Sequence, residues 1–420
     1  CSPFRSNPAV RLLHVPLPHV TCGVELGAMA DERRYPARSE AQLAHGARHA
    51  DPRVLIVSAS AGTGHVTAGR ALHAAFEDAG HARAVHVDVL DLTPRWVRAA
   101  YGGGFELLAS RAPAIWRQVY RRSDGANVDE ARWSALARQI IFREFHRLLT
   151  AERWSACVCT HFLPAQLAAG HPQAPPFASV ITDFTLHRYW VQPRVRQYYV
   201  ATTAIARDLR SRLPGTNVET SGIPVASAFG RRYDSADARA ALGLATQGRI
   251  VLIMGGGLGI GVEESVRAAL DSGIPDMQIV AVCGRNATTR ERLTRLGVDR
   301  ARLRVLGYAD DMAALYAAAD VVVTKPGGLT CSEALAVGRP LILTRAIPGH
   351  EEGNVRYLTA AGAAVSAPAS TDVAPALWNM FRDDAVLAWY ARRAHDTGMP
   401  DAAHSIAASL MRRVTRTAAA

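Results

Sequence analysis

The chain has 420 residues, 49% of them hydrophobic, which is enough to bury the cores of two domains. Its formal net charge of +11 is carried almost wholly by arginine, because Lys325 is the only lysine. The basic excess is compatible with nucleic acid, an anionic membrane or acidic ligands. No Lys/Arg block, RNA-binding aromatic signature or zinc-finger spacing is present, so nucleic acid is not an expected partner.

The six cysteines form no disulfide framework, which indicates a reducing compartment. No apolar run approaches the length of a membrane span, and no basic region followed by an apolar stretch opens the chain. We therefore expect a cytoplasmic protein whose membrane contact is peripheral. Residues 1–50 have no clear periodicity and are expected to form a largely irregular leader.

The first regular segment predicts the opening of a doubly wound α/β domain. Arg53–Ser60 is an apolar strand, Ala61–His65 is a glycine turn, and Val66–Ala79 has the pattern of an amphipathic helix that ends at Gly80. Ala84–Leu92 is the next strand. Strand, turn, helix and strand in this order are typical of a parallel sheet.

The first glycine turn does not match a dinucleotide fingerprint, because Thr67 stands where G-x-G-x-x-G requires a third small residue. His65 instead follows Gly64 at the start of a helix, at the edge of the sheet where α/β proteins bind ligands. A helix N-terminus disfavours imidazolium, so His65 is a candidate neutral base. The alternative is a capping or surface histidine.

Pro94–Asp124 interleaves aromatic residues with arginines, a combination that suits a membrane interface. The alternative is a helix pair whose aromatic residues form core, since Trp116 and Tyr120 have simple i, i+4 spacing. The aromatic residues of this segment are Trp96, Tyr101, Phe105, Trp116 and Tyr120.

Two later strands end in polar loops. Ala156–Thr160 is followed by His161, whose period-2 spacing with two cysteines suggests zinc, but no second ligand pair follows and no metal site is expected. Phe177–Thr182 is followed by Asp183, His187 and Trp190. Asp183 is a candidate to hold a histidine in its tautomer or to take a proton itself; the alternative is a turn cap.

A second α/β unit begins after a polar helical connector, Phe229–Leu244. Arg249–Met254 is its first strand, and the glycine-rich turn that follows can bring backbone N–H groups to a diphosphate, although it too lacks G-x-G-x-x-G in register. Leu303–Tyr308 is a later strand. The turn contains Gly255, Gly256, Gly257 and Gly259.

Val321–Gly362 is the most informative stretch. A buried strand, Val321–Thr324, leads into Lys325-Pro-Gly-Gly, and Thr330 or Ser332 opens a helix with Glu333 in its first turn. The turn and the helix end form an anion site, and the Glu333 carboxylate suits a ribose diol. A second turn, Ile347–Glu351, opens a helix through Asn354. The alternative to an anion site is an ordinary βαβ crossover whose glycines only serve packing.

This stretch resembles the monogalactosyldiacylglycerol synthase and processive diacylglycerol glucosyltransferase family, which carries K-x-G-G-x-T-x-x-E-A followed by P-G-Q-E-x-x-N. His350 stands where the family usually has Gln, which bears on sugar preference. The resemblance extends to the G-x-G-H part of the family's S-x-x-G-x-G-H, which ends at His65, and to T-D-F-x-x-H-x-x-W from Thr182 and G-I-P-V from Gly222. The family also carries P-x-x-W-x-x-x-Y, where this chain has P-x-W-x-x-x-x-Y from Pro94.

The resemblance implies a GT-B fold, with an acceptor- and membrane-side Rossmann-like domain over 51–228, a UDP-sugar-binding one over 229–390, and a C-terminal helix over 391–420 that crosses back to the first domain. It implies inverting transfer of a hexose from a UDP-sugar to diacylglycerol, with His65, alone or together with Asp183, as base and without a metal or other cofactor. The residues implied to bind the donor are Gly255, Gly256, Gly257, Gly259, Gly307, Tyr308, Lys325, Gly327, Gly328, Leu329, Thr330, Glu333, Pro348, Gly349, His350, Glu351 and Asn354. Those implied to face acceptor or membrane are Gly64, Trp96, Trp116, Tyr120, His187 and Trp190.

Other functions remain open on the same scaffold. The acceptor can be a polyprenyl-linked intermediate, as in the peptidoglycan N-acetylglucosaminyltransferase. UDP-N-acetylglucosamine 2-epimerases share the fold, and a non-catalytic lipid-binding module is a third alternative. A dinucleotide dehydrogenase is disfavoured by the two failed fingerprints.

Overall fold

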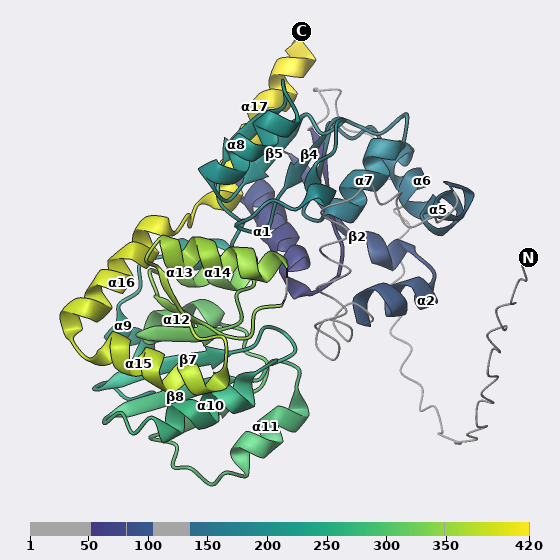
Figure 1. The fold of residues 1–420 in the computed structure, drawn as a ribbon. Helices are drawn as coiled ribbons and strands as arrows, with labels where there is room; N and C mark the ends of the chain where they lie inside the picture. Colours follow the sequence, from purple (N-terminus) through teal and green to yellow (C-terminus); the bar gives the residue numbers. More distant parts are fainter. Residues whose placement is uncertain (1–51, 81, 104–134, 348, 420) are drawn as a thin grey trace, which may run out of the picture. The chain divides into compact units, whose positions relative to one another are not determined.

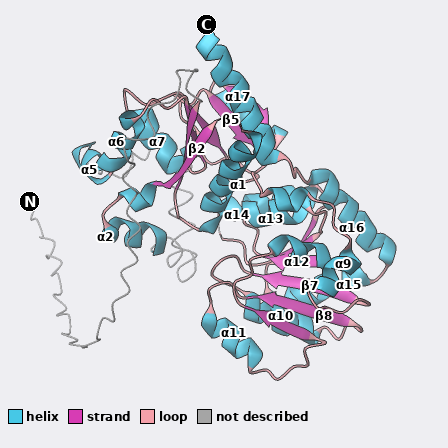
Figure 2. Cartoon of the chain, turned by 180° about the vertical axis from the view of Figure 1, so that it is seen from behind, coloured by secondary structure: helices cyan, strands magenta, loops and turns pink. Residues whose placement is uncertain are grey.

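The computed structural model describes residues 52–80, 82–103, 135–347 and 349–419. Within them two parallel sheets of six strands each are formed, and residues 51–420 belong to one compact unit. Figure 1 follows the chain through both sheets, and Figure 2 shows the strands in magenta from behind.

The first sheet has the strand order β2-β1-β3-β4-β5-β6. Its strands are short, and β1, β3, β4 and β5 are almost wholly buried, as expected for a parallel sheet covered by helices on both faces. Its strands are β1 Arg53–Ser58, β2 Arg83–Asp88, β3 Ala156–Cys159, β4 Phe177–Val180, β5 Gln197–Val200 and β6 Asn217–Thr220.

The second sheet repeats the plan with the order β12-β11-β10-β7-β8-β9. Apolar β-branched runs again form its centre, and β8 and β10 are buried throughout. Its strands are β7 Arg249–Met254, β8 Met277–Val282, β9 Leu303–Leu306, β10 Val321–Thr324, β11 Leu341–Leu343 and β12 Ala364–Ser366.

Helices connect the strands of both sheets. In the first half these are α1 Thr63–Ala79, α2 Arg95–Arg98, α5 Ala135–Ile141, α6 Arg143–Ala151, α7 Phe162–Gly170 and α8 Thr203–Arg212. In the second half they are α9 Ser235–Ala241, α10 Val262–Asp271, α11 Ala287–Thr294, α12 Met312–Ala318, α13 Gly328–Ala336, α14 His350–Ala360, α15 Val373–Phe381, α16 Asp384–Thr397 and α17 Ala402–Ala419.

The strand order of each sheet reverses between two central strands, β1 and β3 in the first sheet and β7 and β10 in the second. Loops that leave neighbouring strands at such a switch point run to opposite sides and open a crevice at the carboxyl edge of the sheet. The glycine turn with His65 follows β1, and His161 follows β3. Gly255–Gly261 follows β7 and Lys325–Gly328 follows β10, so all four segments lie where such folds bind ligands.

The terminal helix α17 packs on the first sheet, as predicted. Ile406 and Leu410 are buried in one cluster with Phe76 of α1. The Tyr199 hydroxyl of β5 donates to Ser409 Oγ at 3.2 Å, and Ser409 Oγ donates in turn to the Glu219 carboxylate at 2.7 Å. The helix therefore returns to the half of the chain that precedes the second sheet.

Several predicted boundaries are wrong, among them the following three. The helix after the first turn begins at Thr63, and the strand that follows ends at Asp88, whose side chain accepts from Leu90 N and starts a 3-10 turn. The helix after Lys325 begins at Gly328, so Glu333 lies beyond its first turn. The domain boundaries at 228 and 390 stay predictions.

Two strands were missed, β6 and β12, and each lies at the edge of its sheet. Strand β6, Asn217–Thr220, pairs with β5 at the edge of the first sheet, but its sequence NVET has a single apolar residue and no alternation to reveal it. An edge strand with one neighbour has less side-chain surface to bury than a central strand.

Candidate active site

A cavity of about 1960 Å³ opens at the carboxyl edges of both sheets. Its lining includes all four segments at the switch points, with residues from 60–67, 161–167, 255–261 and 325–330. Typical small-molecule pockets measure about 300–1,000 Å³. The cavity is therefore large enough to hold two substrates side by side.

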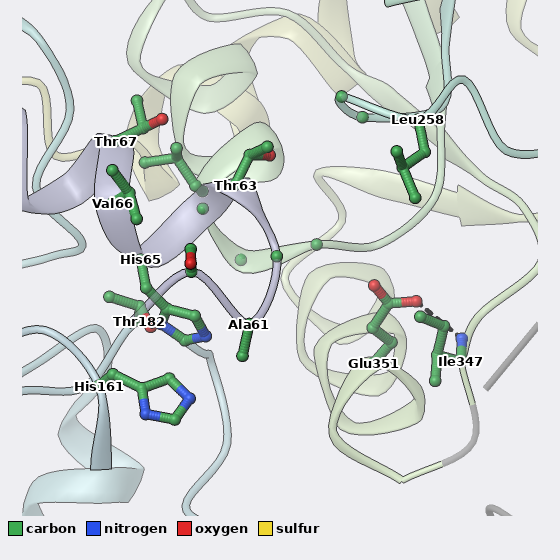
Figure 3. A pocket seen from close by; sticks show the side chains of 18 of the residues that line it. Ala61, Thr63, His65, Val66, Thr67, His161, Thr182, Leu258, Ile347 and Glu351 are labelled. Carbon is green, nitrogen blue, oxygen red and sulfur yellow. Dashed lines mark hydrogen bonds between the residues drawn. The ribbon is translucent and has the colours of Figure 1, made fainter. Parts of the chain in front are cut away.

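His65 lies in the first turn of α1, at the wall of this cavity (Figure 3). Its Nδ1 is 3.0 Å from the Thr160 carbonyl oxygen and 2.8 Å from Thr182 Oγ1. A carbonyl oxygen can only accept, so Nδ1 carries the proton and Nε2 is the basic nitrogen. The fold thus sets the tautomer that a general base needs.

Asp183 was predicted as one candidate to set that tautomer. The structure gives this role to Thr160, whose backbone oxygen faces Nδ1 because β3 is the neighbour of β1. The sequence offered no signal for a backbone acceptor. The prediction that Asp183 takes a proton itself stays open, and Asp183 does line the cavity.

A polar network lies beneath the turn that carries His65. The hydroxyl of Thr160 donates to the His65 carbonyl oxygen at 2.9 Å, and Ser58 Oγ lies 2.8 Å from Thr160 Oγ1. Ser58 Oγ is also 2.7 Å from His86 Nε2 on β2. Burial, with His73 and Arg70 nearby, lowers the pKa of His86 from its usual 6.5 to about 4. His86 is therefore neutral at physiological pH and anchors the network without a charge.

Asn354 was predicted to bind the donor sugar, but it is 0% exposed and does not line the cavity. Its Nδ2 donates to Asp183 Oδ1 at 3.1 Å and to the Pro326 carbonyl at 3.0 Å, and its Oδ1 accepts from Phe184 N at 2.9 Å. All three hydrogen bonds of the Asn354 amide therefore go to other groups of the protein. Asn354 thus joins the loop of Asp183 to the turn after β10, and its predicted contact with a sugar stays a prediction.

The same two segments touch through glycine. A Cβ at Gly328 would stand 2.0 Å from the Thr182 carbonyl oxygen, and a Cβ at Gly353 would stand 2.4 Å from Thr185 Oγ1. Only a residue without a side chain fits at Gly328, because the obstacle there is backbone. Glycine therefore allows the first turn of α13 to lie directly against the end of β4.

The donor side of the cavity contains the two glycine turns. Gly259 has a positive φ of 61° and its Cβ would stand 2.4 Å from the Cys283 carbonyl oxygen. Helix α10, which follows this turn, has Glu263 and Glu264 in its first turn, whereas α13 has no acidic residue there. The positive end of α13 is therefore the better place for an anion.

Lys325 stands beside that helix end. Its Nζ donates to Glu351 Oε1 at 2.7 Å, and Glu351 Oε2 accepts from Ile347 N at 2.7 Å (Figure 3). The Glu351 side chain is 1% exposed, so it binds Lys325 from the protein interior. Glu351 was predicted to hold the sugar; in the structure it lines the cavity and orients Lys325.

Most of the other predicted donor residues line the cavity. Gly255, Gly256, Gly257, Gly259, Tyr308, Lys325, Gly327, Gly328, Leu329 and Thr330 do so. Gly307, Glu333 and Gly349 do not, Pro348 lies outside the described residues, and of His350 only the backbone, the start of α14, is described. Their roles toward a donor stay predictions.

Glu333 has a different environment from the one predicted. Its Oε2 accepts from the Tyr316 hydroxyl at 3.3 Å, and burial raises its pKa to about 8. Glu333 on α13 therefore faces Tyr316 of α12. The contact of Glu333 with a ribose stays a prediction.

Of the predicted acceptor residues, Gly64, His187 and Trp190 line the cavity, and Trp96 does not. Trp96 is 59% exposed on α2, which is against a core role for this ring. Trp116 and Tyr120 lie outside the described residues. An apolar wall next to His65 was not predicted; it contains Val97, Tyr101, Phe142, Phe162, Leu163 and Leu167.

The described residues contain neither a cluster of metal ligands nor a membrane-spanning helix. In that part of the chain, no group of three or more His, Cys, Asp or Glu residues is placed to hold an ion. Cys157 and Cys159 are buried free thiols on β3. None of the described helices combines the length and the apolar character that crossing a bilayer would require.

Comparison with protein families gives two matches. Residues 65–225 match the model of monogalactosyldiacylglycerol (MGDG) synthase, and residues 250–380 match the glycosyltransferase family 28 C-terminal domain. Residues 226–249 lie between the two matches. The first match begins at His65, just after β1, and includes β3. The second includes β10 and all of β7 except Arg249.

Curated relatives agree with these matches. A processive diacylglycerol beta-glucosyltransferase of Bacillus pumilus is 34% identical over 214 residues, which are 50% of this chain and 55% of the relative. The chain thus spans about half the length of that relative. One of the same description from Bacillus cereus is 28% identical over 350 residues, 80% of this chain and 87% of the relative.

Among solved structures, MurG of Acinetobacter baumannii superimposes with a TM-score of 0.58 at 18% identity, over 86% of this chain and 99% of that one. A likeness at this identity shows the fold alone. It confirms the predicted GT-B arrangement of two doubly wound sheets.

Proposed function

Because the chain belongs to the family of monogalactosyldiacylglycerol synthases and processive diacylglycerol glucosyltransferases, we propose that it transfers a hexose from a UDP-sugar to diacylglycerol with inversion. One observation carries this proposal. A histidine held in the tautomer of a base shares its cavity with a cationic helix end, where a departing diphosphate would lie.

His65 is the base of the proposed step. Its Nε2 takes the proton from the free hydroxyl of the acceptor, and the hydroxyl oxygen forms a bond to the anomeric carbon of the sugar. The bond from that carbon to the UDP oxygen breaks on the opposite side, and UDP leaves as an anion. The proton on His65 passes to water after the product departs.

The leaving diphosphate is stabilised by the first turn of α13 and by Lys325. Backbone N–H groups from Gly328 onward and the Nζ cation are fixed before the reaction, so no reorganisation is needed as charge develops. Preorganised groups of this kind supply the charge compensation that a metal supplies in other transferases. We propose that no metal is required.

The protein acts at the cytoplasmic face of a membrane in this proposal. The net charge of +11 favours anionic lipid, and the exposed Trp96 suits the headgroup region. The apolar wall that includes Val97 and Leu167 is suited to the acyl chains of a lipid acceptor.

The test is transfer to diacylglycerol in anionic liposomes, with UDP-glucose and UDP-galactose offered separately to wild type and His65→Ala. We expect glycolipid from one donor, a loss of at least about a hundredfold in the variant, and no effect of a chelator. UDP binding should be unchanged in the variant, which serves as the folding control.

Two outcomes would favour a different function for this protein. Turnover with a polyprenyl-linked acceptor but not with diacylglycerol would favour the peptidoglycan-type transferase. Isomerised UDP-sugar in the absence of any lipid would favour a 2-epimerase. Retained glycolipid synthesis in His65→Ala would remove this histidine from the mechanism.

A further inference from the structure

A second histidine lies beside the proposed base. His161 follows β3, which neighbours β1, and its ring centroid is 4.5 Å from that of His65 at an interplanar angle of 87°. The residue is 2% exposed and lines the cavity. Figure 3 shows the two rings one beside the other at the same wall.

The hydrogen bonds of His161 define its tautomer. Its Nδ1 accepts from Leu163 N at 3.0 Å and caps the first turn of α7. Burial, with the neighbouring His65, keeps its pKa well below the usual value, so the ring is neutral. A neutral imidazole whose Nδ1 accepts must carry its proton on Nε2.

The Nε2–H group therefore has donor capacity in an apolar setting. Phe162 lies at 4.1 Å between ring centroids, and Tyr101 and Trp190 at 6.4 Å each. Among the described residues, the hydrogen bond of His161 is the one that Nδ1 accepts, and Nε2 is not one of the buried atoms left without a partner, so this nitrogen is reached from the cavity that His161 lines. A donor that faces the cavity and has no acceptor in the protein is placed to bond to an oxygen of a ligand.

We propose that His161 Nε2–H donates a hydrogen bond to an ester carbonyl oxygen of the acceptor lipid and so places the free hydroxyl at His65. This inference rests on the proposed function. His161 is not a second base, because its Nδ1 is occupied and Nε2 is protonated. The hydroxyl oxygen is a poor partner, since a donated bond would reduce its nucleophilicity.

An ester carbonyl satisfies both constraints. In diacylglycerol an ester carbonyl lies within a few bonds of the free hydroxyl, so both oxygens can reach two adjacent rings. The acyl chain attached to that carbonyl would then continue along the apolar wall formed by Phe162 and Leu167. His161 is thus an acceptor-binding residue that selects esters.

The test compares diacylglycerol with a dialkylglycerol, the ether analogue that lacks both carbonyls, in wild type, His161→Asn and His161→Gln. Asn keeps an acceptor near the capping position but has no donor at the distance of Nε2. Gln can return an amide N–H to that distance. Thermal unfolding and the KM for the UDP-sugar are measured alongside.

We expect wild type to prefer the ester about tenfold in kcat/KM, the size of one neutral hydrogen bond in a dry site. His161→Asn should lose this preference through a higher KM for the ester, with the ether unaffected, and His161→Gln should regain part of it. Equal losses on ester and ether, or a wild type without ester preference, would overturn the proposal. Absence of transfer by wild type to either acceptor would instead overturn the proposed function, and this proposal with it.

Discussion

At the scale of single residues, the candidate base depends on neighbours that contribute backbone and hydroxyl groups. His65 is oriented by the Thr160 carbonyl and the Thr182 hydroxyl, and its own carbonyl is held by Thr160. These groups are at the ends of β3 and β4, the strands next along the sheet. A serine, two threonines and a neutral histidine thus replace the carboxylate that orients histidines in many enzymes.

The network beneath His65 predicts a pH dependence of stability. Between pH 6.5 and about 4, unfolded His86 binds a proton that the folded chain does not, so stability is lost as pH falls through this window. His86 is partly exposed, so the loss is about 1–2 kcal/mol rather than the full linkage value. Urea unfolding at pH 7 and pH 4.5 measures it.

His86→Gln is the matched variant, because its amide can still bond to Ser58 Oγ without titrating. Its unfolding free energy should fall less than that of wild type between the two pH values, by the same 1–2 kcal/mol. An identical pH profile in both proteins would show that His86 is protonated normally in the fold.

At the scale of elements, two loops and two helix ends are joined by contacts that only small or amide side chains permit. Gly328 and Gly353 bring α13 and α14 against residues 182–185, and Asn354 bonds to both sides of this junction. The junction fixes Asp183 relative to the turn of Lys325. Groups predicted for the acceptor and for the donor are therefore positioned by one contact region.

Asn354 provides the test of this junction. In Asn354→Ala, Phe184 N and the Pro326 carbonyl lose their buried partner, so the unfolding free energy should fall by about 2–3 kcal/mol. We expect kcat to fall as well, because Asp183 loses its donor. Denaturant unfolding and steady-state kinetics with the UDP-sugar measure the two effects.

A direct sugar contact would give the opposite pattern. The KM for the UDP-sugar would then rise while the unfolding free energy stayed at the wild-type value. Asn354→Asp is the matched control, since it keeps the shape and the acceptor for Phe184 N but places a carboxylate beside Asp183. If Asn354 acts as the junction, the unfolding free energy and kcat of Asn354→Asp should be no higher than those of Asn354→Ala.

At the scale of the whole molecule, charge is the property that bears on location. The net charge of +11 rests on arginines, and the cavity lining includes Arg70, Arg98 and Arg188 together with acidic residues. Binding to anionic vesicles should therefore weaken as salt rises from 0.1 M to 1 M, where the Debye length shrinks from about 10 Å to about 3 Å.

Sedimentation with vesicles of anionic and of zwitterionic lipid measures this expectation. Trp96→Ala should reduce binding at high salt more than at low salt, because the ring contributes apolar rather than charged attraction. Binding that is equal on both lipids, or independent of salt, would exclude an electrostatic attachment.

The sequence by itself determined the fold class, the two glycine turns and the histidine of the first turn. These features are local, because a buried parallel strand and the turn after it leave a pattern within a few residues. Lys325 and the anion site beside it were visible for the same reason. The family motifs then added the predicted substrates.

Only the tertiary structure decided which groups face each other. Thr160 and His161 meet His65 because β3 lies beside β1, although about a hundred residues separate them in the chain. Asn354 bonds to Phe184 N because α14 packs against the loop after β4. Such pairings depend on strand order and close backbone approach, which a pattern of neighbouring residues does not record.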